Sequence, residues 1–320
     1  MDVLTHFAVP YLLMWLLRRP QAERLAAGIG GYAPDADVFT GWIGMFGSEW
    51  TFLGHRTGSH SLVLAPLYAL GVMSVLCLPP WSRWFPRMAV WRFTPRLVLI
   101  AMAGSLTHLA LDGVTTSGIP LLFPFTVERV SLNWFSYSVA PAFLVSSFLV
   151  YRLLRGTATE AALHGAAVAL AACFVLAGTV RALTHPDVGE EALTIPGRME
   201  WEWRVLRPVE NGWETTTWSW GAPGESRLYE ERVPDDPQAR RAVRLAQASV
   251  HYQAHLLYSY GPQVVQVERL GDGAWSVVFL EVLGRAQADE ASPFRVRGTD
   301  SEEGVLRVVV DAAGVHLVEP

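Results

Sequence analysis

Long apolar runs separated by short polar segments fill the first 185 residues of the chain. Six runs are evident, at residues 3–17, 22–33, 61–78, 97–111, 132–154 and 163–183. A helix that crosses a bilayer needs about 20 apolar residues, and the first two runs are shorter than that. The pattern predicts a mainly α fold for residues 1–185, a polytopic helical membrane domain with about six membrane elements. The first two elements would form a helical hairpin.

The pattern changes in the tail, residues 186–320. Residues 201–232 mix tryptophan with Thr, Val and Glu, and residues 263–283 and 304–318 alternate between apolar and polar positions, as strands do. Residues 237–260 begin with proline and repeat small apolar residues at helical spacing. The tail is therefore expected to be a soluble α+β domain, and it contains no catalytic motif.

Arginines predict which loops face the cytoplasm. The loop at 79–96 holds four of them, and Arg152 and Arg155 close the fifth apolar run. Cytoplasmic loops carry an excess of Lys and Arg, so these segments are expected inside. The loops at 34–58 and 113–131 then lie outside, and the last run carries the tail outside. This topology predicts a multi-pass protein of a bacterial inner membrane with an extracytoplasmic C-terminal domain.

Composition agrees with a membrane location and excludes one class of partner. Only 17% of the residues are charged, whereas soluble proteins carry about 25%. The net charge of -5 gives no basic footprint for nucleic acid, so no nucleic-acid partner is expected. Cys77 and Cys173 each lie inside an apolar run and are expected to be packed thiols.

Histidines and aspartates, residue types that bind metal ions, gather near the ends of the apolar runs. The densest stretch is residues 54–62, Gly-His-Arg-Thr-Gly-Ser-His-Ser-Leu. The arginine rule, which uses none of these residues, places all the candidates on the outer side. The seven candidate metal ligands are His6, Asp35, Asp37, His55, His60, His108 and Asp112.

Spacing supports a metal site. His108 and Asp112 are four residues apart, so on a helix they share one face. Asp35 and Asp37 flank a single small residue. Histidine mixed with carboxylate suits zinc, manganese or iron(II), and seven candidates suffice for two or more ions. We therefore expect a di- or trinuclear site, most simply of zinc.

Such a site suggests hydrolysis. Two-metal centres activate water and clamp the attacked oxygens. Either Asp35 or Asp37 could then serve as general base, and Arg56 could bind an anionic group such as phosphate. Other polar residues of the two outer loops could shape the pocket: Glu49, Thr115, Thr116 and Ser117.

Non-catalytic explanations exist for each motif. His108 and Asp112 could form a buried hydrogen bond that locks two helices, and His6 could be a satisfied core histidine. The histidines at 55 and 60 could belong to a capping turn. The chain would then be a membrane protein with a structural cluster and a partner-binding tail. A metal or proton transporter is a third class, but it would need ionisable residues through the depth of the membrane, and the last two runs supply almost none.

The ordered motifs resemble a known family. They are His6 in an apolar N-terminal helix, Pro34-Asp35-Ala36-Asp37, His55-Arg56-Thr57-Gly58-Ser59-His60-Ser61 and His108-Leu109-Ala110-Leu111-Asp112, followed by Thr115-Thr116-Ser117-Gly118 and Leu121-Leu122-Phe123-Pro124. Over residues 1 to about 155, or as far as 185, they look like the YdjM-like family. Its members are described as membrane-bound metal-dependent hydrolases, some as LexA-binding inner-membrane proteins. The family's usual HRGxTHS stretch is His-Arg-Thr-Gly-Ser-His-Ser here, and both histidines are kept.

That family resembles, more distantly, zinc-dependent phospholipase C and its nuclease relatives, which are helical and bind zinc clusters through His and Asp. The resemblance implies phosphoester hydrolysis, with membrane lipids as neighbours and a phospholipid headgroup or another phosphoester as substrate. The tail lies outside the resemblance, and an envelope protein is its expected partner in the non-catalytic alternative.

Overall fold

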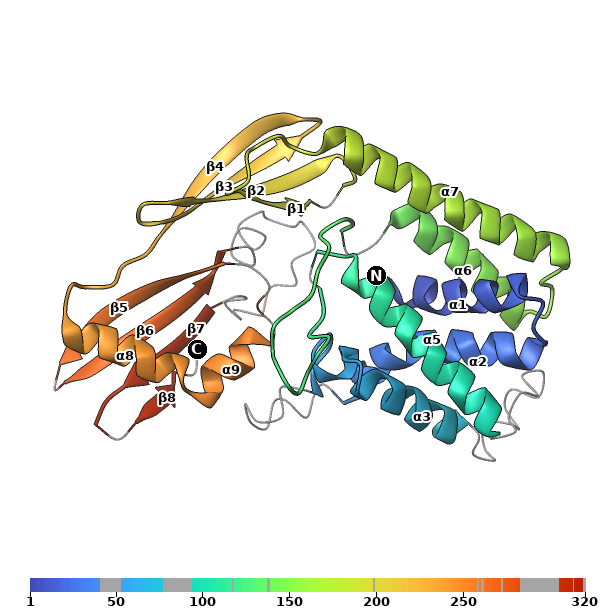
Figure 1. Cartoon of the computed structure of the whole chain (residues 1–320), viewed down its shortest axis with the longest axis horizontal. Coiled ribbons are helices and arrows are strands. Elements are labelled where there is room, and N and C mark those ends of the chain that lie inside the picture. Colours follow the sequence, from blue (N-terminus) through green and yellow to red (C-terminus); the bar gives the residue numbers. More distant parts are fainter. Residues whose placement is uncertain are drawn as a thin grey trace. The chain divides into compact units, whose positions relative to one another are not determined.

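The protein is described by a computed structural model (Figure 1). The described residues are 1–40, 53–76, 94–116, 118–136, 139–197, 199–257, 259, 262–271, 273–282, 305–312 and 314–318. Predictions for Glu49, Cys77, Ser117 and most of the arginine-rich loop fall outside them.

The chain divides into two compact units. One comprises Met1–His185 with Pro196–Glu202, and the other comprises Pro186–Ile195 with Trp203–Pro320. Each has its own buried apolar clusters, and the polar candidates all belong to the first unit.

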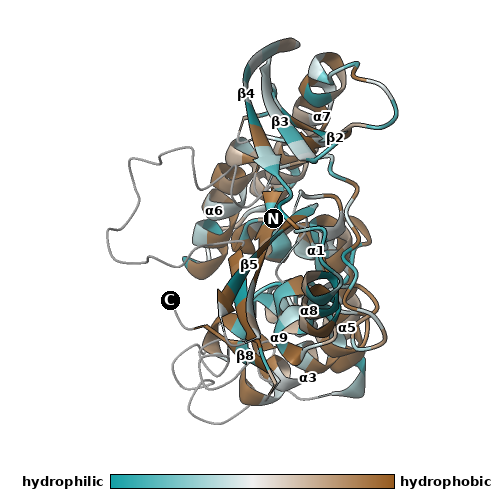
Figure 2. Cartoon of the chain, turned by 90° about the vertical axis from the view of Figure 1, so that its left-hand side faces the viewer, coloured by the Kyte–Doolittle hydropathy of each residue, from teal (hydrophilic) through white to brown (hydrophobic). Residues whose placement is uncertain are grey.

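Helices build the first unit. They are α1 (Val3–Leu16), α2 (Gln21–Tyr32), α3 (Leu64–Leu76), α5 (Pro95–Gly113), α6 (Ala140–Leu154) and α7 (Glu160–Thr184), with the short 3-10 helices η1 (Ala33–Phe39) and η4 (Gly58–His60). The side chains of Asp2, Thr94 and Thr159 accept a backbone hydrogen bond at the starts of α1, α5 and α7. Such caps satisfy amides that have no partner within the helix, which fixes where each helix begins. Figure 2 shows hydrophobic residues prevailing along α3 and α6.

Glycine allows α2 to pack directly against two neighbours, α1 and α5. A Cβ atom at Gly30 would overlap the carbonyl oxygen of Ala101 on α5, and one at Gly31 would overlap that of His6 on α1. Small residues let helix backbones approach in this way. The approach brings the ends of α1, α2 and α5 together; His6 lies on α1, His108 and Asp112 lie on α5, and α2 leads directly into η1.

The predicted polytopic helical membrane domain is wrong. Among the described residues, α7 is the one helix that is long and apolar enough to cross a membrane by length and composition. Helices α1, α3 and α6 are apolar but have only 14, 13 and 15 residues, against the roughly 20 that a span needs. The multi-pass topology, and with it the outward placement of the tail, loses its support.

Two apolar runs, the third and the fifth, proved longer than the helices inside them. The third and fifth runs begin at Ser61 and Leu132, but their helices begin at Leu64 and Ala140. Ahead of α3, Leu62 N instead donates to Leu121 O at 3.0 Å in the loop between α5 and α6. Ahead of α6, Leu132 N donates to Gly113 O at 2.8 Å, at the end of α5. Hydropathy records how apolar a residue is, not whether its backbone is helical, which explains the overcount.

The loop between α5 and α6 closes over the polar candidates. Isolated bridges pair Thr115 with Phe135 and Ile119 with Val130. Arg129 donates to the carbonyl oxygen of Arg56 at 3.1 Å, which ties this loop to the segment before η4. Thr116 donates to the backbone of Phe135, so its hydroxyl braces the loop.

The second unit is α+β, and apart from β1 its strands lie within the segments where strands are predicted. They form two four-stranded sheets, ordered β1 (Leu193–Pro196), β2 (Glu202–Val209), β3 (Gly212–Ser219), β4 (Ala222–Glu230) and β5 (Gln263–Gly271), β6 (Ala274–Glu281), β7 (Val305–Val310), β8 (Val315–Leu317). Hydrophilic residues prevail along β4, which is exposed over most of its length (Figure 2).

One helix predicted over residues 237–260 is instead two, α8 (Pro237–Gln247) and α9 (Val250–Leu256). The break falls at Ser249, whose hydroxyl accepts a hydrogen bond from Tyr252 N at 3.2 Å and caps α9. Alanines of α8 pack with Val277 and Phe279 of β6 in the core of this unit.

Candidate metal centre

The seven residues predicted as ligands converge where α1, η1, η4 and α5 meet. His6 comes from α1, Asp35 and Asp37 from η1, His60 from η4, and His108 and Asp112 from α5, with His55 in the segment before η4. Six are buried, and the seventh, His55, has 56% of its side chain exposed. The cluster is thus inside the protein with one member at its edge.

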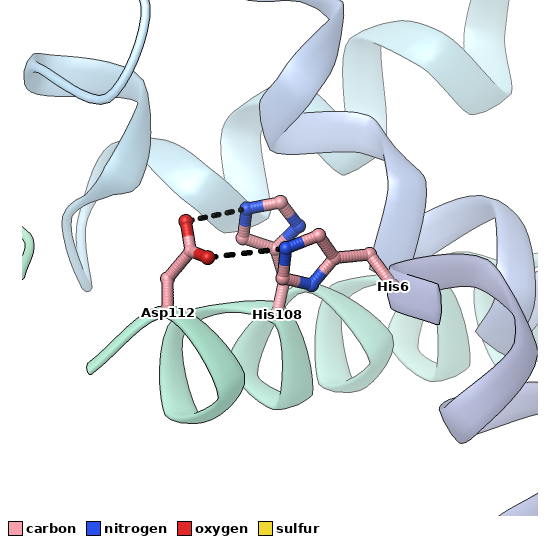
Figure 3. A group of neighbouring side chains, drawn as sticks. All are labelled: His6, His108 and Asp112. Atoms are coloured by element: carbon pink, nitrogen blue, oxygen red, sulfur yellow. Dashed lines mark hydrogen bonds and ion pairs between the residues drawn. The ribbon is translucent and has the colours of Figure 1, made fainter. Parts of the chain in front are cut away.

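One group within the cluster consists of His6, His108 and Asp112 (Figure 3). Asp112 Oδ1 lies 3.1 Å from His6 Nε2, and Asp112 Oδ2 lies 3.5 Å from His108 Nε2. The two imidazole rings stack at 3.7 Å, with His6 reaching in from α1. The predicted sharing of one helix face by His108 and Asp112 is confirmed.

A second group consists of Asp35, His55 and His60. Asp35 Oδ1 lies 3.4 Å from His60 Nε2 and 3.9 Å from His55 Nδ1. In each group one atom from every residue lies within 4.8 Å of the others, as a shared ion requires. The groups touch, because Asp35 Oδ1 is also 3.6 Å from His108 Nε2.

Hydrogen bonds on the outer sides of two rings determine where their inner nitrogens point. His108 Nδ1 lies 2.7 Å from the carbonyl oxygen of Gly31, which can only accept, so Nδ1 carries the hydrogen. Ser59 donates its hydroxyl proton to Asp37 at 2.6 Å, so it accepts from His60 Nδ1 at 2.9 Å. In the neutral form, both Nε2 atoms therefore direct lone pairs into the cluster.

Those two Nε2 atoms lie 3.0 Å apart. Two lone pairs facing each other at this distance repel, so a proton or a metal ion must lie between them. Two nitrogens on one tetrahedral zinc, each bonded at about 2.0–2.1 Å, would be about 3.3 Å apart. The observed separation needs only a few tenths of an ångström of adjustment.

Asp37 differs from Asp35 in its surroundings. Its oxygens accept hydrogen bonds from Ser59 Oγ, from His55 Nδ1 at 2.9 Å and from the Arg56 amide at 3.2 Å. Burial alone would raise the pKa of Asp37, but the bonds from His55 and His60 outweigh it and hold the pKa well below its usual range. Asp37 is thus an ionised anchor for both histidines.

Asp35 is buried with one oxygen open. Its Oδ2 accepts no hydrogen bond from any described residue. The Nδ1 atom of His6 likewise has no hydrogen-bond partner among the described residues. Burial favours a raised pKa for Asp35, yet the contact with His60 and the neighbouring imidazoles hold the pKa below its usual value. An ionised carboxylate with a buried open oxygen is costly unless something else pairs with it.

His60 has the opposite balance. Burial favours a lower pKa, but the bonds to Asp35 and Asp37 outweigh it and raise the pKa above its usual value of 6.5. Without a metal, a proton on His60 would therefore separate the two facing nitrogens.

Two cations lie against Asp112. The guanidinium of Arg56 is 2.7 Å from Asp112 Oδ1, and the N-terminal amino group of Met1 forms an ion pair with the same oxygen. Arg56 also donates to Thr115 at 2.9 Å and has a positive φ of 58°, a conformation uncommon outside glycine. This backbone position turns the side chain of Arg56 into the cluster while its amide binds Asp37.

Three participants were not predicted from the sequence: the carbonyl of Gly31, the hydroxyl of Ser59 and the amino group of Met1. Ser59 could have been suspected, because it lies within the densest motif and beside a candidate ligand. The other two are backbone groups, which no residue-type pattern reveals.

The residues present fit a divalent cation. Three buried carboxylates gather with four imidazoles, two of whose lone pairs face each other, and one carboxylate oxygen is open. The His and Asp groups could therefore hold a metal ion, and their donor types suit zinc, manganese or iron(II).

Comparison with known proteins gave one match. Residues 1–183 match the family model described as YdjM inner membrane protein. No curated protein and no solved structure matches the chain. The matched segment contains all seven ligand candidates and ends near the end of α7.

Proposed function

The chain belongs to the YdjM family of inner membrane proteins, and from that premise we propose that it is a metal-dependent hydrolase of phosphoester bonds. Its centre would hold two or more divalent ions, zinc first among the candidates. Its ligands would come from the His6 group and the Asp35 group, and His60 and His108, one from each group, would hold an ion between them.

One observation carries this proposal: the Nε2 atoms of His60 and His108 face each other 3.0 Å apart. Both rings are held in this orientation by the hydrogen bonds of their Nδ1 atoms. A structural histidine normally aims its second nitrogen at a donor or acceptor of another kind. These two rings converge from different elements, and both lie close to Asp35 and Asp112. Such an arrangement supports a cation between them.

Four residues at the cluster would have distinct roles in the reaction. His55 lies at the exposed edge and marks where substrate enters. Arg56 would bind a nonbridging oxygen of the phosphoryl group while remaining paired with Asp112. Asp35, with its open Oδ2, would hold a proton taken from the attacking water. Asp37 would keep His55 and His60 oriented.

Bound divalent ions would supply the remaining chemistry by lowering the pKa of a water molecule and stabilising charge on the phosphoryl oxygens. Burial of the cluster strengthens this effect, because charges interact more strongly where water is excluded.

Metal content is the first test. The protein, purified in detergent and incubated with zinc or manganese, is expected to bind at least two ions per chain by inductively coupled plasma mass spectrometry. His60→Ala and His108→Ala should each lose metal. His164→Ala is the matched control, because His164 is an exposed histidine on α7 of the same unit. A wild-type protein that stays metal-free would refute the proposal.

Activity is the second test, using bis(p-nitrophenyl) phosphate and phospholipid vesicles. Metal-dependent release of product that disappears in the two histidine variants is expected. The non-catalytic alternative also has support, because Met1 and Arg56 already neutralise Asp112. Stoichiometric metal with no turnover on either substrate would favour that alternative.

A further inference from the structure

An apolar groove lies beside the metal centre. It has a volume of about 830 Å³ and runs between α3 and the segments that carry His6, Asp35 and Asp37. The residues of α3 that line it recur every three or four positions from Leu64 to Leu76, which is one face of the helix along its whole length. We call this cavity the α3 groove.

The α3 groove is polar only at one end. Among its described lining residues, only Tyr32, Thr40 and Tyr68 carry polar side-chain groups. Thr40 Oγ1 lies 3.1 Å from the hydroxyl of Tyr68 and donates to the carbonyl oxygen of Asp37 at 3.1 Å. The polar end is therefore the end at the metal centre, and the far end, toward Val75 and Leu76, is hydrocarbon.

The groove and the centre share their walls. Ala36, between the two aspartates of η1, and Phe7, next to His6, both line it. A molecule seated in the groove would thus have one end within reach of the cluster. Leu67 and Val75 of the groove remain about half exposed, at 51% and 49%, so apolar surface is left for an occupant to cover.

We propose that the α3 groove binds one hydrocarbon chain of a membrane phospholipid and thereby directs the lipid's phosphoester to the metal centre. The inference rests on the proposed function for the chemistry at the lipid headgroup, and on the α3 groove alone for the binding of the hydrocarbon chain. It makes an amphipathic phosphoester, and not a small soluble one, the substrate class.

Size agrees with this occupant. The lining face of α3 spans twelve residue steps, or about 18 Å at roughly 1.5 Å per residue. A zigzag of C–C bonds of about 1.5 Å advances roughly 1.3 Å per carbon, so about fourteen carbons would fit. The volume also lies within the roughly 300–1,000 Å³ of small-molecule sites.

Gly71 offers a way to fill the groove without disturbing the fold. It lines the groove midway along α3, and a Cβ atom there would meet nothing within 4 Å. Leucine is also a better helix former than glycine. The Gly71→Leu variant should therefore fold, and its leucine side chain should exclude the lipid's hydrocarbon chain from the groove. Gly165→Leu on α7 is the matched control, because Gly165 is equally open but lies away from the groove.

The test uses photolabelling of the full-length protein in nanodiscs of phosphatidylethanolamine and phosphatidylglycerol. The probe is a phosphatidylethanolamine with a diazirine in its acyl chain, and labelled residues are mapped by mass spectrometry. Label is expected to concentrate on α3 and Ile29 of the groove, to fall at least fivefold in Gly71→Leu, and to stay at wild-type level in Gly165→Leu.

Equal labelling of Gly71→Leu and wild type would overturn the inference, as would label spread evenly over the exposed apolar residues of α6 and α7. A second copy of the chain in the groove would overturn it too, and would appear as a dimer that Gly71→Leu dissociates. Metal content measured on the same samples separates the two proposals. Labelling of the α3 groove in a protein without metal refutes only the proposed hydrolase function. Bound metal without labelling of the groove refutes only the proposed binding site for the hydrocarbon chain.

Discussion

The two aspartates of η1 should respond differently to the same substitution. Asp→Asn keeps the shape of the side chain, removes its charge and turns one acceptor oxygen into a donor. Asp37 uses both oxygens to accept from Ser59, His55 and the Arg56 amide, whereas Asp35 leaves Oδ2 open. The substitution therefore breaks an existing network at Asp37 and removes a candidate ligand at Asp35.

The expected magnitudes follow from those contacts. Asp37→Asn loses at least one hydrogen bond to a charged group and places an amide against a donor, which costs about 3 kcal/mol of unfolding free energy. For a unit of this size, that lowers the Tm of the metal-free protein by roughly 6–12 °C. Metal affinity should fall by about 10–100-fold, the usual effect of losing a group that orients a ligand.

Asp35→Asn should show the reverse pattern. Its contacts with His60 and His108, at 3.4 and 3.6 Å, are longer than the hydrogen bonds that Asp37 accepts, and its Oδ2 has no donor to lose among the described residues. The metal-free Tm should therefore fall by less than in Asp37→Asn, while metal affinity falls by more. Affinity is measured by competition with a chromophoric chelator, and Tm by circular dichroism after chelation.

The comparison has its own control, because both variants change the same residue type by one charge. The assignment of Asp35 as a ligand is refuted if Asp35→Asn binds metal as tightly as Asp37→Asn does. Equal losses of metal-free Tm in the two variants would show that Asp37 is not the anchor.

Three further predictions concern the centre and its frame. The pKa of His60 is raised, so the proton on His60 stabilises the metal-free fold below pH 6.5, and that stability is lost as pH rises through the folded pKa. The gain in Tm on adding zinc should therefore grow from pH 6 to pH 8.5. A gain in Tm that does not change with pH would contradict this. His55→Ala should remove one of two bound ions, measured by metal analysis, because His55 is the exposed member of the Asp35 group and the His6 group remains complete. Loss of both ions, or of neither, would show that His55 does not serve one ion alone. Gly30→Ala should lower the Tm strongly through overlap with Ala101. Gly71→Ala, at an open helical position, should leave the Tm unchanged or raise it, because alanine adds roughly 1 kcal/mol of helix propensity to the stability. Equal Tm changes in the two would count against the close backbone contact.

The sequence predicts the candidate ligands well because their chemistry is carried by side chains. His108 and Asp112 are four residues apart, and any helix places them together. His55 and His60 lie within one short motif, so one turn brings both to the cluster, His60 inside it and His55 at its edge. The strands of the tail follow from alternation, since a pleated strand places successive side chains on opposite faces.

Other features depend on backbone geometry, which residue types do not encode directly. The different roles of Asp35 and Asp37 arise from which oxygen meets the turn at Ser59, and neither spacing nor charge distinguishes them. The number of membrane spans was overestimated because the residues before α3 and α6 are apolar but pair with a loop. The acceptor at Gly31 is a carbonyl, and it becomes visible only once α2 and α5 are in contact.

The contact between α2 and α5 also has a thermodynamic consequence. Gly30 lies against Ala101, and Gly104 of α5 lies against Ala27, so the two helices interlock through their main chains about one turn from Asp35 and His108. Ordering a flexible residue costs about 1–2 kcal/mol of conformational entropy. Ligands mounted on such a rigid frame are ordered before any ion arrives, so little of the free energy of binding is consumed in immobilising the chain.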